Sequence, residues 1–215
     1  AIALAEAGAH ATCADISDAS DTADMIKGCA AHVDVSNPVS VTTLFEAAGP
    51  LDIVVNAAGI LIESPTLDMS VDAYERQMNV NLKGTILVGQ AALKTQSERG
   101  NGRQILIASE LGVLGREGFA AYCASKAGVI ALTRSFAREF APHILVNAVA
   151  PGPTDTPMLA PDTMSAEALA LDMANPLGRI GTPQEIAAAV VFLASPGASF
   201  MTGQTICPSG GAVML

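Results

Sequence analysis

The sequence has few charged residues, and few of these are basic. Charged residues make up 15% of the 215-residue chain, well below the usual quarter, whereas hydrophobic residues make up 50%. This balance excludes an intrinsically disordered chain. Eleven Lys and Arg residues stand against 21 Asp and Glu residues, which gives a formal net charge of -10. Because an acidic surface repels phosphate backbones and anionic lipid, we expect neither a nucleic-acid partner nor a membrane-surface role.

Long hydrophobic runs are also missing. The longest, such as 187–194, fall far short of the roughly 18–20 apolar residues that span a bilayer. The four cysteines lie apart, with no CxxC pair and no neighbouring histidine cluster, so we expect neither a disulfide framework nor a metal site. Free thiols are typical of a reducing compartment, and the sequence therefore predicts a cytoplasmic protein.

The chain alternates between strand-like and helical segments. The strand-like segments are short and apolar, at 10–16, 31–35, 52–58, 103–108, 144–150 and, more weakly, 204–207. Helical patterns separate most of them, at 39–48, 71–97, 119–140 and 184–194. Apolar strands that alternate with helices are typical of a parallel sheet covered on both faces. We therefore predict one doubly wound, Rossmann-type α/β domain over residues 1–215.

Two segments, at the N-terminus and after residue 150, have predicted structural roles. Residues 1–7 have the pattern of a helix capped by Gly8, and in a parallel sheet such a helix crosses over from an earlier strand. We therefore expect roughly 15–20 further residues, including a glycine-rich phosphate loop, ahead of Ala1. A proline-rich loop at 151–161, followed by a short helical pattern at 165–174, is expected to act as a lid.

Small, polar or turn-forming residues follow five of the predicted strands. They are Asp15, Asp34, the run from Asn56 to Gly59, Ser109, and Pro151 with Gly152. In a doubly wound sheet, ligands bind beyond the carboxyl ends of the strands. We therefore predict that these residues line a cofactor cleft, although the same residue types also form ordinary turns.

Asp15 bears on the choice of cofactor. A carboxylate at the end of this strand accepts hydrogen bonds from the ribose hydroxyls of an adenosine and repels a 2′-phosphate. No basic residue that would neutralise such a phosphate occurs before Lys27. This pattern favours NAD over NADP. Asp34, just before Val35, is the candidate for an adenine contact. For both carboxylates the alternative is an N-cap of the following helix.

Tyr122 and Lys126 are the sharpest chemical signal in the sequence. They lie one helical turn apart, so both side chains face the same way from the predicted helix. A phenol has a pKa near 10, so acid–base work near neutrality requires that pKa to fall by about 2–3 units. A neighbouring ammonium group and a cationic nicotinamide ring are able to supply such a shift.

Several motifs together resemble those of the short-chain dehydrogenases/reductases. The run Tyr122-Cys123-Ala124-Ser125-Lys126 resembles the YxxSK segment of that family, and Ser109 precedes it at the spacing of the family's catalytic serine. Asn56-Ala57-Ala58-Gly59 is similar to the NNAG motif. The remaining matches are Asn79 to Gly84, Asn147 to Gly152, Gly178-Arg179, Pro183 to Ala187, and Thr202 to Gln204. The resemblance extends over essentially the whole chain.

The resemblance implies a catalytic set. Tyr122 would be the general base for alcohol oxidation or the general acid for carbonyl reduction, and Lys126 would lower its pKa and bind the nicotinamide ribose. Ser109 would hydrogen-bond the substrate oxygen, and Asn81 would hold a water that joins Lys126 to solvent. The implied cofactor contacts are Tyr122, Lys126, Asp15, Asp34, Val35, Asn56, Ala57 and Gly59, with Pro151, Gly152, Thr154 and Thr156 toward the nicotinamide.

The sequence departs from the family pattern in two places. The glycine-rich TGxxxGxG loop is missing, so no pyrophosphate-binding residue is named. Ser209 stands where the family has an aspartate before its final Gly-Gly pair, at Gly210 and Gly211. We expect the second difference to alter packing near the C-terminus and to leave activity intact.

Three functions compete. The leading hypothesis is an NAD-dependent dehydrogenase or reductase of secondary alcohols and ketones. The first alternative is an NADPH-dependent 3-oxoacyl-[acyl-carrier-protein] reductase, which would need a basic patch such as Arg99, Arg103 and Arg116 to dock its acidic carrier. A remote alternative is a non-enzymatic dinucleotide sensor. Within the leading hypothesis, Glu63 and Glu110 are candidates to bind a polyol.

An assembly is also expected. The apolar helix patterns and the tail 212–215 exceed what one small domain leaves exposed. Family members are usually dimers or tetramers, and we predict a homotetramer.

Overall fold

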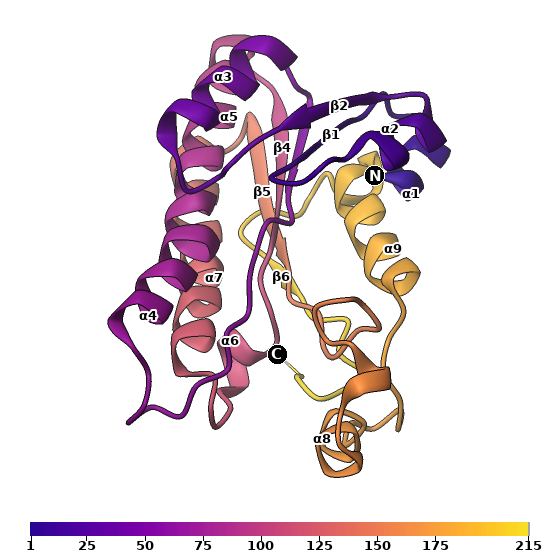
Figure 1. The fold of residues 1–215 in the computed structure, drawn as a ribbon. Helices are drawn as coiled ribbons and strands as arrows, with labels where there is room; N and C mark the ends of the chain where they lie inside the picture. The colour runs from indigo at the N-terminus through magenta and orange to yellow at the C-terminus, as the bar shows by residue number, and fades with distance from the viewer. Residues whose placement is uncertain (215) are drawn as a thin grey trace.

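The computed structural model of the protein describes residues 1–214, in which strands and helices alternate (Figure 1). The strands are β1 (Thr12–Asp15), β2 (Cys29–His32), β3 (Ile53–Asn56), β4 (Gly102–Ile107), β5 (Ile144–Val149) and β6 (Thr205–Ile206). The α-helices are α1 (Ile2–Glu6), α2 (Ser20–Ile26), α3 (Pro38–Ala48), α4 (Val71–Met78), α5 (Gly84–Arg99), α6 (Leu111–Leu114), α7 (Ala120–Phe140), α8 (Ala166–Asp172) and α9 (Pro183–Ala194). A π-helix (Asn79–Lys83) joins α4 to α5, and short 3-10 helices occupy Pro161–Thr163 and Pro196–Ala198.

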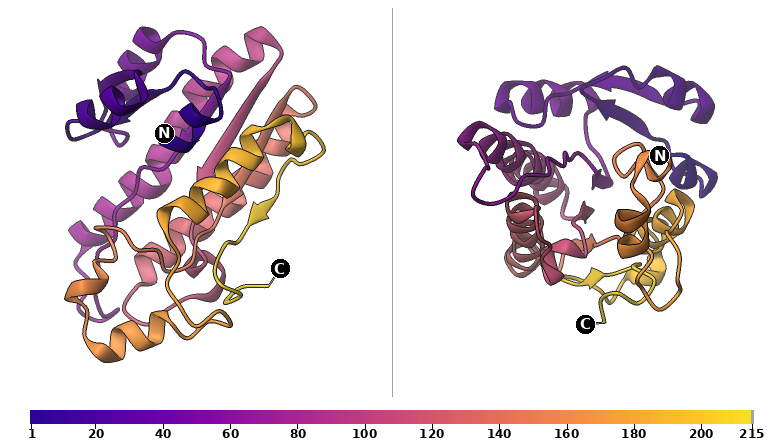
Figure 2. Two further views of the ribbon diagram at one scale, coloured as in Figure 1. Left: turned by 90° about the vertical axis from the view of Figure 1, so that its right-hand side faces the viewer. Right: turned by 60° about the horizontal axis from the view of Figure 1, so that its bottom comes forward.

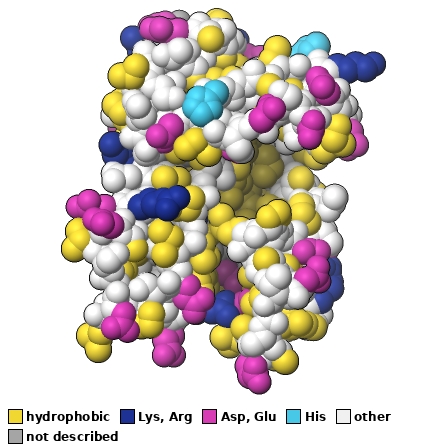
Figure 3. Space-filling model, in the orientation of Figure 1, with side chains coloured by type: hydrophobic (Ala, Val, Ile, Leu, Met, Phe, Trp, Pro, Cys, Tyr) yellow, Lys and Arg dark blue, Asp and Glu magenta, His cyan; other side chains and the backbone are white. Residues whose placement is uncertain are grey.

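All strand pairs are parallel, which confirms the predicted α/β class. The ladders nevertheless form two sheets, because β1 pairs only with β2, while β3, β4, β5 and β6 pair in that order. Within residues 1–214 no ladder joins the two groups. The space-filling view shows a hollow with hydrophobic walls beneath the layer of β1 and β2 (Figure 3).

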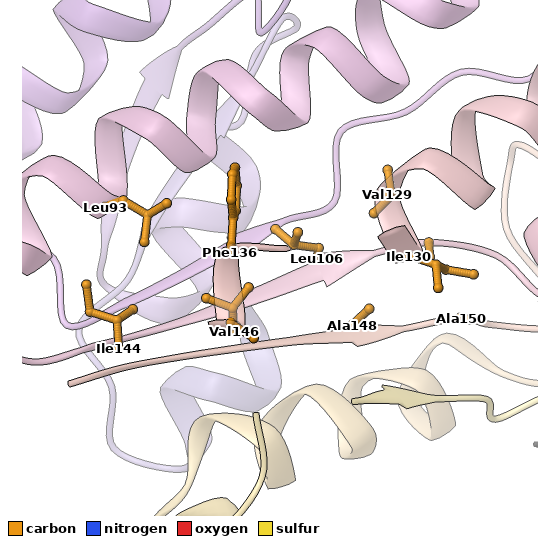
Figure 4. Close-up of a cluster of buried hydrophobic side chains, with 11 residues drawn as sticks. Leu93, Leu106, Val129, Ile130, Phe136, Ile144, Val146, Ala148 and Ala150 are labelled. Atoms are coloured by element: carbon orange, nitrogen blue, oxygen red, sulfur yellow. The ribbon is translucent and has the colours of Figure 1, made fainter. Parts of the chain in front are cut away.

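Helices cover both faces of the four-stranded sheet (Figure 2). On one face, α5 and α7 contact strands β3, β4 and β5, and on the other face α9 contacts β4 and β5. The largest core cluster lies under α5 and α7, where Phe136 and Leu93 meet Leu106, Ile144 and Val146 (Figure 4). Val146 and Ile144 are at most 1% exposed. Because parallel strands are buried on both faces, their sequences are apolar almost throughout.

A second cluster attaches the two-stranded sheet to the rest of the molecule. Val33 and Val35, just after β2, are buried against Val54 of β3 and Val88 of α5. The attachment is therefore made by side-chain packing. Phe45 from α3 completes this cluster.

The boundaries of some elements differ from those expected. The second predicted strand, 31–35, lies at Cys29–His32, because residues 34–37 form turns held by side-chain oxygens. The single helix expected at 71–97 is α4, the π-helix and α5 in succession. The short helix expected at 165–174 is present as α8.

Two sequence expectations concern the C-terminal tail and the length of the helices. Leu215, part of the apolar tail expected to contribute to an assembly, lies outside the described residues. In the part of the chain that the structure describes, no helix is both long and apolar enough to cross a membrane.

Candidate active site

Tyr122 and Lys126 project from the first two turns of α7 into the carboxyl-end region of the four-stranded sheet. Tyr122 is buried, and the Lys126 Nζ atom lies 5.7 Å from the centre of its ring. The same ammonium group donates a hydrogen bond to the carbonyl of Ile107, the last residue of β4, at 2.9 Å. Ser109, two residues farther along, hydrogen-bonds the phenol of Tyr122. The structure therefore brings Ser109, Tyr122 and Lys126 together, as the sequence predicts.

Burial shifts the pKa of both titratable groups. It raises the pKa of the Tyr122 phenol above its ordinary value, and the hydrogen bond with Ser109 opposes this rise. It lowers the pKa of Lys126 to about 8. The expected lowering of the Tyr122 pKa is thus not present in this structure. The reason is geometric, because the ammonium group binds the Ile107 carbonyl and burial dominates at the phenol.

Asn81 connects this pair to a loop of the cleft. It lies in the π-helix, is fully buried, and exchanges two hydrogen bonds with the backbone of Ile60, at 2.8 and 2.9 Å. Its Nδ2 atom also donates to the hydroxyl of Ser125, which in turn donates to the carbonyl of Tyr122. π-Helical turns are rare and are frequently found at functional sites. Ser125 was not predicted as a site residue, although it lies inside the YxxSK segment.

Gln77 repeats the arrangement one helical turn earlier. Its side-chain amide accepts from the N–H of Ile62 at 3.0 Å and donates to the carbonyl of the same residue at 3.2 Å. Gln77 is only 1% exposed. Asn81 and Gln77 together hold the backbone of residues 60–62 as a neighbouring strand would. In the sequence, this support of residues 60–62 is indicated only by the spacing of Gln77 and Asn81, two amide side chains one helical turn apart.

Asp15 and Asp34 form identical local turns. In each, one carboxylate oxygen accepts from the backbone N–H and the hydroxyl of the serine two residues on, Ser17 or Ser36. These bonds lower the pKa of both carboxyl groups, so both are ionised at neutral pH. The alternative that they cap helices is wrong, because the N-caps of α2 and α3 are Ala19 and Asn37.

The other residues predicted on the adenosine side have different surroundings. Val35 is buried, with its side chain against Gly84, where a Cβ would lie only 2.8 Å away. Asn56 is buried and donates to the hydroxyl of Thr85 at 2.9 Å. Ala57 is exposed. Gly59 lies against Lys126, since a Cβ there would be 3.3 Å from the Lys126 Nζ atom. A side chain at position 59 would therefore crowd the lysine.

The residues predicted to reach the nicotinamide form a tight turn after β5. Thr154 donates through its hydroxyl to the carbonyl of Gly152 at 2.9 Å, and Thr156 donates to the carbonyl of Thr154 at 3.3 Å. The carbonyl of Pro151 accepts from the N–H of Glu110, the residue after Ser109. The two strand ends, β4 and β5, are thereby joined at the cleft.

Glu110 is a buried carboxyl group whose role the sequence did not establish. Burial, followed by the charge of Asp172, raises its pKa to about 7, whereas Arg116 acts in the opposite direction. Asp172, the last residue of α8, is itself buried and forms an ion pair with Arg116. Arg116 lies four positions before α7 and 56 positions from Asp172, so the sequence does not indicate this contact.

The residues present fit the two ends of a nicotinamide dinucleotide. An ionised carboxylate stands at the end of β1, as a ribose ligand requires. Gly59, after β3, brings the backbone close to the Lys126 Nζ atom, which a Cβ at this position would approach to 3.3 Å. Residues that would hold the pyrophosphate are not among those identified.

Comparison with known proteins identifies the family. A family model described as "Enoyl-(Acyl carrier protein) reductase" matches residues 1–213. The chain belongs to the short-chain dehydrogenase/reductase family. A solved structure described as a short chain dehydrogenase/reductase family protein superimposes with a TM-score of 0.89 at 36% identity, covering 97% of this chain and 88% of the other. The chain is thus an oxidoreductase that acts on CH–OH or carbonyl groups with a nicotinamide cofactor.

Two curated relatives illustrate the range of the family. The chain is 38% identical to a cis-4-hydroxycyclohexanecarboxylate dehydrogenase of Sinomonas cyclohexanicum, over 97% of this chain and 88% of the relative. It is also 38% identical to the 3-oxoacyl-[acyl-carrier-protein] reductase FabG of Vibrio harveyi, over 88% of this chain and 78% of the relative. Relatives of comparable identity therefore act on different substrates.

Proposed function

We propose that the protein is an NAD(H)-dependent oxidoreductase of secondary alcohols and ketones, with Tyr122 as its general acid–base. The observation that carries this proposal is the contact set of Ser109, Tyr122 and Lys126 at the carboxyl end of β4. Asp15, ionised at the end of β1, supports the choice of NAD over NADP, because its charge repels a 2′-phosphate.

A bound nicotinamide would supply the hydride acceptor or donor, and its oxidised ring would bring a positive charge to the site. In alcohol oxidation, Tyr122 takes the hydroxyl proton while Ser109 hydrogen-bonds the substrate oxygen. In the reverse direction the phenol returns that proton to the carbonyl oxygen. Because burial alone raises the pKa of Tyr122, the lowering that this step requires falls to charges that arrive with the cofactor.

Lys126 and Asn81 would carry protons between Tyr122 and solvent. The side chain of Asn81 is committed to Ile60 and Ser125. The water-holding role implied for Asn81 therefore falls to its main-chain carbonyl, which accepts from the Thr85 hydroxyl at 2.7 Å and has a second lone pair. Lys126, with a pKa of about 8, exchanges protons readily near neutral pH.

The cofactor preference is tested by titrating the protein with NADH and with NADPH at one salt concentration and monitoring the fluorescence of the nucleotide. We expect tighter binding of NADH. A preference for NADPH would refute the role of Asp15, and absence of binding by either nucleotide would refute the function. Tyr122→Phe tests the mechanism, since it should lower turnover about 100-fold to 10,000-fold while NADH binding is retained. A non-enzymatic sensor would keep its function in this variant.

An NADPH-dependent 3-oxoacyl-[acyl-carrier-protein] reductase is the second candidate. Its support is the FabG relative, and its difficulty is Asp15 together with a chain of net charge -10, which opposes docking of an acidic carrier. Of the three arginines that would form the basic patch, Arg99 and Arg116 are paired with Asp52 and Asp172. Activity with acetoacetyl thioesters and NADPH, exceeding that with NADH, would favour this candidate.

We also propose a homotetramer in the cytoplasm. Large hydrophobic side chains are exposed on and beyond α9, including Phe192, Phe200 and Met214. The four cysteines are free, as in a reducing compartment. A monomer mass in light scattering would refute the assembly.

A further inference from the structure

Glu110 is a buried carboxyl group that the proposed mechanism does not use. Its residue is only 6% exposed, and in the part of the chain that the structure describes its Oε2 atom has no hydrogen-bond partner. A buried polar atom without a partner costs about 1–3 kcal/mol. Such an atom in a native enzyme requires an explanation, and a ligand that supplies the missing bond is one.

Three parts of the candidate site surround this carboxyl. Glu110 follows Ser109 directly, and its backbone N–H donates to the carbonyl of Pro151 at 3.0 Å. A Cβ added to Gly152 would lie 3.0 Å from Oε2, so the carboxyl lies against the turn predicted to reach the nicotinamide. Asp172, at the end of α8, is close enough to act on Glu110 through its charge. The carboxyl thus lies between the residue that follows β4, the turn at Gly152 and the end of α8.

The charges around Glu110 decide which ligand fits. Three titratable or charged groups influence or face it: Asp172 from α8, Arg116 from the loop before α7, and Cys207 just after β6. With its pKa raised to about 7, Glu110 is protonated in a large fraction of molecules at neutral pH and then donates an O–H bond. Arg116 is already paired with Asp172. A substrate carboxylate would therefore meet no unpaired cation, whereas an uncharged oxygen would meet a donor.

We propose, resting on the function proposed above, that Glu110 determines specificity by hydrogen-bonding a second, uncharged oxygen of the substrate. Glu110 directly follows Ser109, and its carboxyl lies against Gly152 in the turn proposed to reach the nicotinamide, so the second oxygen of a small substrate would lie near its reacting carbon. The substrate class is therefore a diol or hydroxyketone whose second oxygen lies one or two carbons from the reacting carbon. A simple alcohol lacks this oxygen, and a hydroxy acid places a negative charge there.

Cyclohexanol and cyclohexane-1,2-diol form the probe pair, because they differ only in the second hydroxyl. Their binding to the NAD⁺ complex is measured by calorimetry in a Tyr122→Phe background, so that turnover does not intervene. We expect the diol to bind about 10-fold or more tightly than cyclohexanol. It should also bind more tightly than 2-hydroxycyclohexanecarboxylate, the anionic comparator. Equal binding of the pair, or a preference for the anion, overturns the proposal.

Two substitutions separate recognition from support of the fold. Glu110→Leu, made in the same background, should abolish the preference for the diol. Glu110→Gln should keep most of it, since a carboxamide also donates and accepts. Glu117→Leu, at an exposed glutamate on the far side of α6, is the matched control and should leave the preference intact. A preference that survives Glu110→Leu overturns the proposal.

The same titrations separate a failure of the proposed function from a failure of the role proposed for Glu110. Failure of the protein to bind NAD⁺ would refute the proposed function, and the role of Glu110 with it. Binding of NAD⁺ without a preference for the diol would refute the role of Glu110 alone. Circular dichroism of each variant verifies that a changed ratio does not arise from unfolding.

Discussion

The side-chain amide of Asn81 donates to the carbonyl of Ile60 and accepts from its N–H, at 2.9 and 2.8 Å. Gln77 forms the same pair of bonds with Ile62. A residue implied in proton transfer is therefore also part of the support of the cleft wall. The two amides give an opportunity to separate these roles, because Gln77 holds the loop but has no contact with Ser125 or Tyr122 among the described hydrogen bonds.

Gln77→Leu should loosen residues 60–62 without touching the proton path. The backbone N–H and carbonyl of Ile62 would lose their partners, at a cost of about 1–3 kcal/mol in the free energy of unfolding. Urea unfolding measures the loss, and hydrogen exchange at Ile62 locates it. Gln90→Leu, on the exposed side of α5, is the control and should change stability by less than about 0.5 kcal/mol. Equal effects of the two substitutions would contradict the assignment.

Lys126→Met should raise stability at neutral pH while abolishing turnover. The pKa of Lys126 is lowered by burial from 10.5 to about 8, so the charged form is disfavoured in the folded state. Removing that charge, with loss of the Ile107 bond, should gain about 1–2 kcal/mol.

The gain from Lys126→Met should depend on pH. Between about 8 and 10.5 the unfolded chain binds more protons at Lys126 than the folded protein does, so wild-type stability from this group rises with pH. The advantage of the variant should therefore shrink across this range and vanish above it. Urea unfolding at pH 7 and pH 10 measures both ends, and an advantage that grew with pH would contradict the lowered pKa.

Asp15→Ala should shift cofactor preference toward NADPH, by about 10-fold or more in the ratio of dissociation constants, because the charge that repels a 2′-phosphate is removed. The chain offers a matched control in Asp18, which accepts the same two bonds from Ser20 that Asp15 accepts from Ser17. Asp18→Ala should leave the ratio unchanged. Fluorescence titration of both variants with both nucleotides shows whether the preference for NADH depends on the carboxylate at position 15 or on the loss of any nearby negative charge.

Asp172→Asn should lower the pKa of Glu110. The charge of Asp172 raises that pKa, and its removal also releases Arg116, whose charge acts in the opposite direction. Nuclear magnetic resonance titration of carboxyl-labelled glutamate measures the shift, with Glu110→Gln assigning the signal. A Glu110 pKa that stayed near 7 would indicate that burial alone sets it.

The alternation of apolar strands and helices is sufficient to predict the fold class. Five predicted strand ends indicate where a site would lie, because parallel strands bring their carboxyl ends to one edge, and that site stays a prediction. Ser109, Tyr122 and Lys126 were predicted together and are together. Strand boundaries were less accurate, as at β2, where serine and asparagine side chains compete with the ladder for backbone groups.

Other features depend on contacts between distant segments. The burial of Glu110 arises from the turn at Gly152 and from α8, neither of which is close to it in the sequence. The hydrogen bond from the Lys126 ammonium to the Ile107 carbonyl is likewise a tertiary contact, and it accompanies a Tyr122 pKa that is raised where the sequence predicts a lowered one. Sequence periodicity carries no information about such pairs.

Asp15, at the end of β1, and Lys126, beside the end of β4, lie 111 positions apart in the sequence. A dinucleotide that contacts both residues, as proposed, would bind the folded chain and not the unfolded one. Its occupancy would then add about 2.7 kcal/mol of stability at a concentration 100 times the dissociation constant. Under the proposed function, the coenzyme is a stabilising ligand as well as a reactant.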